Sequence, residues 1–439
     1  MSDHGSSSLL ALPIDIIYRI LDHLSDFTLL CAVRDVCTRL NSIIDIYYRY
    51  QTLTSLKLEM GEFKHYGIKQ VAAVIRSHVT LTKLNLSYNR IGDEAALHLA
   101  NILQNTTTIT ALYLTENDIE SAGMEHMAKA LRNKTVKLTL LDLTWNRIGD
   151  VGAQHLADTL RTNTTLTTLD LTRNRIENEG IRHLTDALLH NITLTTLYLS
   201  DNKIGALEVQ YLANVLRNNT TLTTLGLRMN SIKDEEIQSL ADALKNNATL
   251  TTLDLGCNQI GTIGAEHLAI ALQNNTVDII LFSCLLYYHL RFLIQALTTL
   301  NLGRNEIGAL GAEYLARALQ NNMTLTTVDL SSNQIRDQGA QYMANALRKN
   351  TKVTTLDLSS NQIQAMGVQY LVNALRSNTT IITLDLSFKE LGERQNQYMN
   401  DKLKYIGHVG LGDVGAESVE RELRDRIDEL LTQNKQRTQ

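Results

Sequence analysis

Apolar residues recur along most of the chain with a long, regular period. Between residues 53 and 391 the pattern L-x-x-L-x-L-x-x-N-x-I, in which x is any residue, returns about every 28 residues. The twelve copies open at Leu53, Leu81, Ile109, Leu138, Leu166, Leu194, Leu222, Leu250, Leu297, Leu325, Val353 and Ile381. A unit of this size cannot bury its apolar face alone, so neighbouring copies must stack. The pattern predicts one repeat array, in place of the roughly three globular domains that the length alone suggests.

Each copy is predicted to form a short strand followed by a helix. In the copy that begins at Leu166, Thr-rich filling up to Leu171 is typical of a strand. Apolar residues from Ile181 to Leu188 then follow at the spacing of an amphipathic helix. Ten of the twelve copies also hold an asparagine after the strand: Asn89, Asn117, Asn146, Asn174, Asn202, Asn230, Asn258, Asn305, Asn333 and Asn361. The end copies carry Gly61 and Lys389 there.

The unit resembles the ribonuclease-inhibitor type of leucine-rich repeat, over about Leu53 to Leu391. The resemblance implies an α/β fold: a curved leucine-rich repeat solenoid, or horseshoe, with a parallel inner sheet and outer helices. It also implies that the recurring asparagines bond neighbouring backbone groups in a ladder. We assign residues 51–393 to this array.

The segment 9–50 does not follow the repeat, and residues 1–8 are predicted to be a disordered tail. Pro13, the only proline, precedes an apolar helical face, and a second apolar helix follows. This segment resembles an F-box, a small all-α domain. The residues that carry the resemblance are Leu12, Pro13, Asp15, Ile20, Leu21, Leu24, Val36, Cys37, Arg39 and Leu40. Asp15 and Leu40 depart from the family's usual glutamate and aromatic residue.

The F-box resemblance implies docking onto the Skp adaptor of a cullin-based ubiquitin ligase. The adaptor-binding residues that it implies are Leu12, Pro13, Ile16, Ile17, Ile20, Leu21, Leu24, Val36, Cys37 and Leu40. The alternative is a plain helical cap over the first repeat, since solenoid ends need covering. A cap, however, has no reason to begin with Leu-Pro.

Partner binding is expected where the copies differ from one another. Framework positions barely change, whereas residues between and after the strand leucines vary, and strand side chains alternate between core and outside. The candidate partner-binding residues on the concave face or its rim are Tyr113, Glu116, Trp145, Arg173, Tyr198, Asp201, Arg228 and Met229. Trp145, with Arg173 and Tyr113 on neighbouring copies, is the strongest anchor. Random drift on a solvated face explains the same variation.

Two segments interrupt or end the array. Residues 277–295 break the repeat, and removing these 19 residues restores the interval of 28. The codons for Val277 and Gln295 can match the two borders of an intron, so our hypothesis is a retained intron translated in frame. The alternative is a membrane span, which the polar residues His289 and Arg291 disfavour. Residues 394–439 are predicted to form a C-terminal helical cap and tail.

Composition narrows the class of protein. A net charge of −5 argues against nucleic-acid and membrane partners. We expect no signal peptide, because the N-terminal residues lack a basic region followed by a long apolar run. Cys31, Cys37, Cys257 and Cys284 lack C-x-x-C spacing, which favours a reducing compartment. We therefore expect a cytoplasmic protein, with the nucleus as an alternative.

No chemistry-bearing motif points to an enzyme. No glycine is followed by lysine, so a P-loop is missing, and no cofactor is expected. A histidine or tyrosine recurs on the expected helices, at His98, His126, His155, His183, Tyr211, His267, Tyr314, Tyr342 and Tyr370. We interpret these side chains as a packed ladder between helices and not as a metal array, because tyrosine substitutes freely. Recurring N-x-T triplets, such as 105–107 and 163–165, are interpreted as turn chemistry.

The function expected from these features is substrate recognition for a cullin-type ubiquitin ligase. The F-box would dock onto the Skp adaptor and cullin scaffold, and the repeats would bind a protein substrate that the sequence does not name. The alternative is a leucine-rich repeat scaffold or regulatory binder with no link to ubiquitin. Adaptor pull-down separates the two classes.

Overall fold

The computed structural model describes residues 13–23, 53–58, 80–274 and 297–387, with single positions 43, 60, 67 and 75. The expected disordered tail 1–8, the insertion 277–295 and the C-terminal segment 394–439 lie outside the described residues. Five expected adaptor-binding residues do so too: Leu12, Leu24, Val36, Cys37 and Leu40. The chain divides into two compact units, Met1–Leu197 and Tyr198–Gln439.

Twelve short strands form one sheet in chain order, which confirms the predicted repeat array. The first unit holds β1 (Ser55–Lys57), β2 (Lys83–Asn85), β3 (Ala111–Tyr113), β4 (Leu140–Asp142) and β5 (Thr168–Asp170), and β6 (Thr196–Tyr198) ends at the boundary. The second unit continues with β7 (Thr224–Gly226), β8 (Thr252–Asp254), β9 (Thr299–Asn301), β10 (Thr327–Asp329), β11 (Thr355–Asp357) and β12 (Thr383–Asp385).

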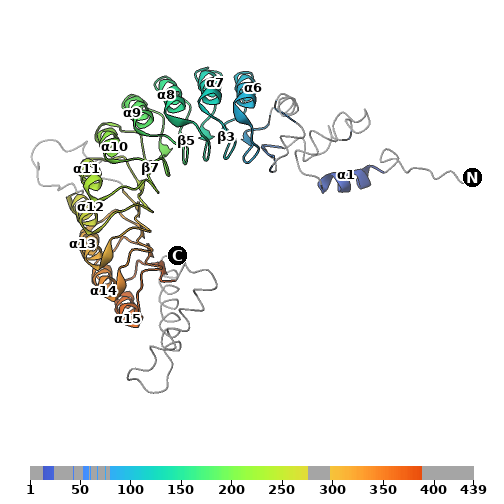
Figure 1. Cartoon of the computed structure of the whole chain (residues 1–439). Helices are drawn as coiled ribbons and strands as arrows, with labels where there is room; N and C mark the ends of the chain where they lie inside the picture. The colour runs from blue at the N-terminus through green and yellow to red at the C-terminus, as the bar shows by residue number, and fades with distance from the viewer. Residues whose placement is uncertain are drawn as a thin grey trace, which may run out of the picture. The chain divides into compact units, whose positions relative to one another are not determined.

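A helix follows most strands. In the first unit these are α6 (Gly92–Gln104), α7 (Ser121–Leu131), α8 (Gly149–Leu160) and α9 (Asn178–Leu188), which lie side by side on one face of the strands (Figure 1). In the second unit they are α10 (Ala206–Asn218), α11 (Asp234–Leu244), α12 (Thr262–Asn274), α13 (Gly308–Asn321), α14 (Arg336–Leu347) and α15 (Ala365–Leu375). Within the described residues, no helix has the length and apolar character to cross a membrane.

The core lies between the strands and the helices. In the repeat that begins at Leu166, both Leu169 and Leu171 are fully buried from the strand side. Ile181 and Leu188 of α9 are buried from the helix side. In most strands only the middle residue is buried, and the first and third residues lie on the opposite, open face of the sheet. That open face is where the repeats can meet a partner.

The repeat register continues across the interruption at 277–295. β8 pairs with β9 in parallel, so that Leu253 lies opposite Leu300. The side chain of Asn305 donates to the carbonyl of Leu255 at 3.1 Å, and its oxygen accepts from the N–H of Ile260 at 3.0 Å. The repeats on either side therefore stack as neighbours, as the restored interval of 28 residues predicts.

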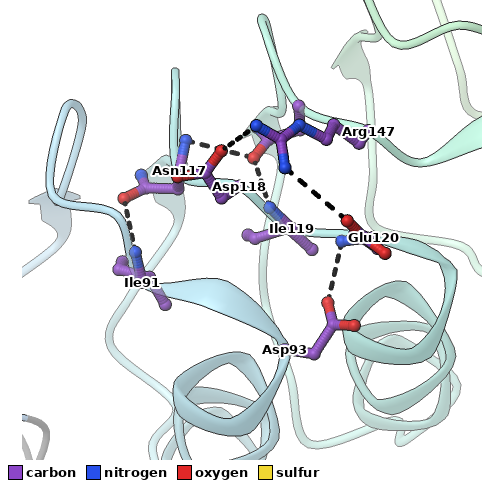
Figure 2. Close-up of polar contacts among 8 residues, drawn as sticks. Ile91, Asp93, Asn117, Asp118, Ile119, Glu120 and Arg147 are labelled. Atoms are coloured by element: carbon purple, nitrogen blue, oxygen red, sulfur yellow. Dashed lines mark hydrogen bonds and ion pairs between the residues drawn. The ribbon is translucent and has the colours of Figure 1, made fainter.

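The recurring asparagines form the expected ladder. In the repeat drawn in Figure 2, the Asn117 side-chain oxygen accepts the N–H of Ile91 in the preceding repeat, at 3.3 Å. The Nδ2 of Asn146 donates to Leu114 and Leu143, and its Oδ1 accepts the N–H of Asn117 at 3.1 Å. Because Asn146 is only 4% exposed, these bonds satisfy backbone groups that water cannot reach.

A second buried asparagine holds the turn before the strand in many repeats. The Oδ1 of Asn163 accepts the N–H groups of Thr165 and Leu166, and its Nδ2 donates to Leu131 of the preceding repeat at 2.8 Å. Turn chemistry is therefore confirmed for the triplet 163–165. In the triplet 105–107, Asn105 is exposed in the turn directly after α6, and its side chain donates to the carbonyl of Asn101 at 2.7 Å.

Candidate partner-binding face

The residue before each ladder asparagine has a left-handed backbone. Trp145 has a φ of 57°, and its N–H donates to Thr172 of the next repeat at 2.9 Å. The equivalent residues with positive φ are Tyr88, Glu116, Arg173, Asp201, Met229, Cys257, Arg304, Ser332 and Ser360. The interrepeat bonds hold a conformation that L-residues rarely adopt. Large apolar side chains at this position are exposed to solvent: Tyr88, Trp145 and Met229 are 50%, 46% and 50% exposed.

The eight predicted partner-binding residues all keep some exposed surface. Glu116, Trp145, Arg173 and Met229 are exposed, and Tyr113, Tyr198, Asp201 and Arg228 are half-buried. They fall in both units: the first holds Tyr113, Glu116, Trp145 and Arg173, and the second holds the other four. Each unit therefore presents its own candidate surface.

The structure joins the two strongest anchors of the first unit. The guanidinium carbon of Arg173 lies 3.7 Å from the centroid of the Trp145 ring. A cation over an exposed indole stabilises by about 0.5–1 kcal/mol, which restricts both side chains before any partner arrives. The sequence predicted only that Trp145 and Arg173 lie on adjacent repeats; it did not predict that the two side chains are in contact.

Sequence reasoning missed Leu140 as a surface residue. Leu140 is the first residue of β4, lies on the open face and is half-buried, whereas Leu141 beside it is fully buried. The eight strands from β5 to β12 all begin with threonine. Comparing this one position across the copies would have singled out Leu140.

Aspartates line the third position of many strands. Asp142 lies opposite Asp170 on neighbouring strands, and each side chain accepts an N–H two residues on, from Thr144 and Thr172. Burial raises the pKa of the Asp170 carboxyl above its usual range, and repulsion from Asp142 adds to this effect. Burial likewise raises the pKa of Asp254 in the second unit.

The expected adaptor-binding residues that the structure describes lie on or next to the N-terminal helix α1 (Ile14–Asp22), and they differ in exposure. Pro13 immediately precedes the helix and accepts the N–H groups of Ile16 and Ile17 at 3.1 Å. Ile17 and Leu21 are buried. Pro13 is exposed, and Ile16 and Ile20 are half-buried, so these three can reach a partner.

The recurring histidines and tyrosines lie on the helices α6 to α10 and α12 to α15. His98 on α6 is exposed, and the other eight are half-buried. Across the described ranges, no group of three histidine, cysteine, aspartate or glutamate side chains is placed to hold a metal ion.

Two family models match the chain. The leucine-rich repeat model matches more than half of it, at 77–100, 105–128, 136–157, 162–184, 190–212, 218–241, 246–269, 295–316, 321–344 and 349–372. The F-box domain model matches residues 9–52. The chain is an F-box/leucine-rich repeat protein. The resemblances carried by Leu12–Leu40 and by the repeats are both confirmed.

A solved structure shows the same fold in a distant protein. One match is a chain of the yeast Rad7 and Elc1 complex, which is 14% identical in sequence and superposes with a TM-score of 0.53. The matched region covers 88% of this F-box/leucine-rich repeat protein and 92% of the Rad7–Elc1 chain. An internalin from Listeria monocytogenes is 21% identical and covers 87% of this chain and 100% of its own, with a TM-score of 0.45. No curated protein sequence matches significantly.

Proposed function

We propose that this protein is the substrate-recognition subunit of a cullin-type ubiquitin ligase. The observation that carries the proposal is the F-box domain at 9–52 joined directly to a repeat array. The F-box docks onto a Skp-type adaptor and through it onto the cullin. The repeats hold a protein substrate, so the chain acts by binding and not by catalysis. Its place is the cytoplasm or the nucleus, where the ligase operates and Cys257 stays a free thiol.

Surface exposure on α1 supports the adaptor role. A helix whose only task was to cap the first repeat would present polar residues outward. Here Ile14 is 44% exposed, and Ile16 and Ile20 keep partly accessible side chains on a helix that directly follows Pro13. Apolar groups held at a surface in this way are suited to a protein partner.

Co-purification with a Skp adaptor tests the proposal. Full-length protein mixed with purified adaptor is expected to elute as a complex, and the pair Leu12→Ala with Pro13→Ala is expected to abolish it. Arg19→Ala, on the exposed side of the same helix, is the matched control and should leave binding intact. A wild-type protein that is folded and does not bind adaptor would support the scaffold alternative.

A further inference from the structure

The open face of β3 and β4 differs from that of the later strands. β4 begins with Leu140 and β3 ends with Tyr113, whereas later strands begin with threonine and mostly end with aspartate or asparagine. Register places Tyr113 opposite Asp142, about 4.8 Å away in the sheet direction. Trp145 lies in the loop that follows β4, and its side chain is 46% exposed. Three apolar or aromatic residues therefore lie on or directly after β3 and β4, beside strands whose open-face residues are mostly polar.

Two carboxylates adjoin this apolar surface without a cation. Asp142 and Asp170 lie opposite one another on β4 and β5. Their hydrogen bonds come from threonines: Thr144 and Thr115 donate to Asp142, and Thr172 donates to Asp170. No lysine or arginine stands on the described strands β3 to β5.

Two arginines that follow β4 and β5 contact other side chains. Arg147 pairs with Asp118 at 2.9 Å and with Glu120 at 3.7 Å (Figure 2). Arg173 stacks on Trp145. Among the described residues, Asp142 and Asp170 accept hydrogen bonds from threonines and form no ion pair, and a cation from outside would relieve the repulsion between them.

We propose that the open face of β3 to β5 binds an extended segment of a partner that carries an apolar side chain followed closely by lysine or arginine. Leu140, Tyr113 and Trp145 receive the apolar side chain, and Asp142 with Asp170 receives the cation. This deepens the proposed function and rests on it for the segment's role, which is to mark a substrate. The charge of the pair excludes an acidic segment.

Selection from a random 12-residue peptide display library on the full-length protein tests this surface. We expect the selected peptides to contain Phe, Trp, Leu or Tyr with Lys or Arg within three positions. The pair Asp142→Asn and Asp170→Asn should weaken the best peptide about thirtyfold, and Leu140→Thr about tenfold. Binding should weaken with salt in the wild type and far less in the aspartate variant.

Both substitutions suit the fold. Asn301 occupies the equivalent strand position and accepts the same turn N–H, from Gly303 at 2.8 Å, and threonine opens eight other strands. The matched control is Asp329→Asn with Asp357→Asn on β10 and β11, which should change affinity less than about twofold. Selection of acidic peptides, no selection, or equal loss in test and control variants would overturn the proposal.

Adaptor co-purification of the same preparations separates this inference from the proposed function. Peptide binding without adaptor binding would leave the β3 to β5 surface standing and remove the ligase role. Adaptor binding without selected peptides would support the ligase role and rule out the proposed peptide-binding surface on β3 to β5.

Discussion

At the scale of single residues, the ladder asparagines carry the connection between repeats. Replacing Asn146 by alanine removes the two bonds that its Oδ1 accepts, so the N–H groups of Asn117 and Ile119 are left buried and unpaired. It also removes the bonds that its Nδ2 donates to the carbonyls of Leu114 and Leu143. We expect the free energy of unfolding to fall by about 2–4 kcal/mol, measured by urea titration. Asn105→Ala is the control; it removes one exposed bond to Asn101 and should cost about 0.5 kcal/mol or less.

The buried carboxyl of Asp170 gives a pH-dependent prediction. Burial raises its pKa above the ordinary 3.8, so the folded state holds a proton that the unfolded chain has already lost. Ionised Asp170 therefore destabilises the fold above the raised pKa, and this penalty disappears as pH falls toward 3.8. Asp170→Asn should raise the free energy of unfolding near neutral pH, with a gain that shrinks on acidification.

Urea titrations of the wild type and of Asp170→Asn across the acidic range measure this difference. A gain that stayed constant with pH, or a loss at neutral pH, would show that the Asp170 charge does not destabilise the fold. The comparison also sharpens the binding test, because the same substitution is expected to stabilise the protein while weakening peptide capture.

At the scale of elements, an aspartate in the first turn of one helix holds the start of the next. The Oδ1 of Asp93 on α6 accepts the N–H of Glu120, the residue before α7, at 2.7 Å (Figure 2). Asp150 makes the same bond to Glu177 ahead of α9. We expect Asp150→Ala to cost about 1 kcal/mol in thermal or urea unfolding.

Asp158→Ala is the matched control, because Asp158 is an exposed residue near the other end of the same helix. It should change stability by about 0.5 kcal/mol or less. Equal effects of the two substitutions would mean that the bond to Glu177 is not what stabilises this junction.

The sequence predicted the elements well because each copy supplies the same evidence again. Strand, asparagine and helix recur together, so one copy read correctly describes all of them. It did not predict the bond from Asp93 to Glu120, since an aspartate in a first turn suggests a role in its own helix. Leu140 was missed because it adjoins the framework residue Leu141 and reads as part of the core pattern.

At the scale of the whole molecule, adaptor binding and partner binding are assigned to separate structures. Each repeat of a solenoid is stabilised mainly by its neighbours, so a substitution in or after β4 should not disturb the structure of α1. Trp145→Ala should weaken a true partner by about 2 kcal/mol and leave adaptor affinity unchanged, with both measured by calorimetry. A parallel loss of adaptor affinity would contradict this independence.

The central claim is that the N-terminal segment docks onto a Skp adaptor while the repeats remain free to bind. The most direct measurement is the affinity of purified full-length protein for purified adaptor, compared between wild type, the Leu12→Ala/Pro13→Ala pair and Arg19→Ala. Our account predicts a stable complex for wild type and Arg19→Ala, none for the pair, and the same circular dichroism melting of the repeats in all three. Absence of a wild-type complex, or undiminished binding by the pair, would contradict it.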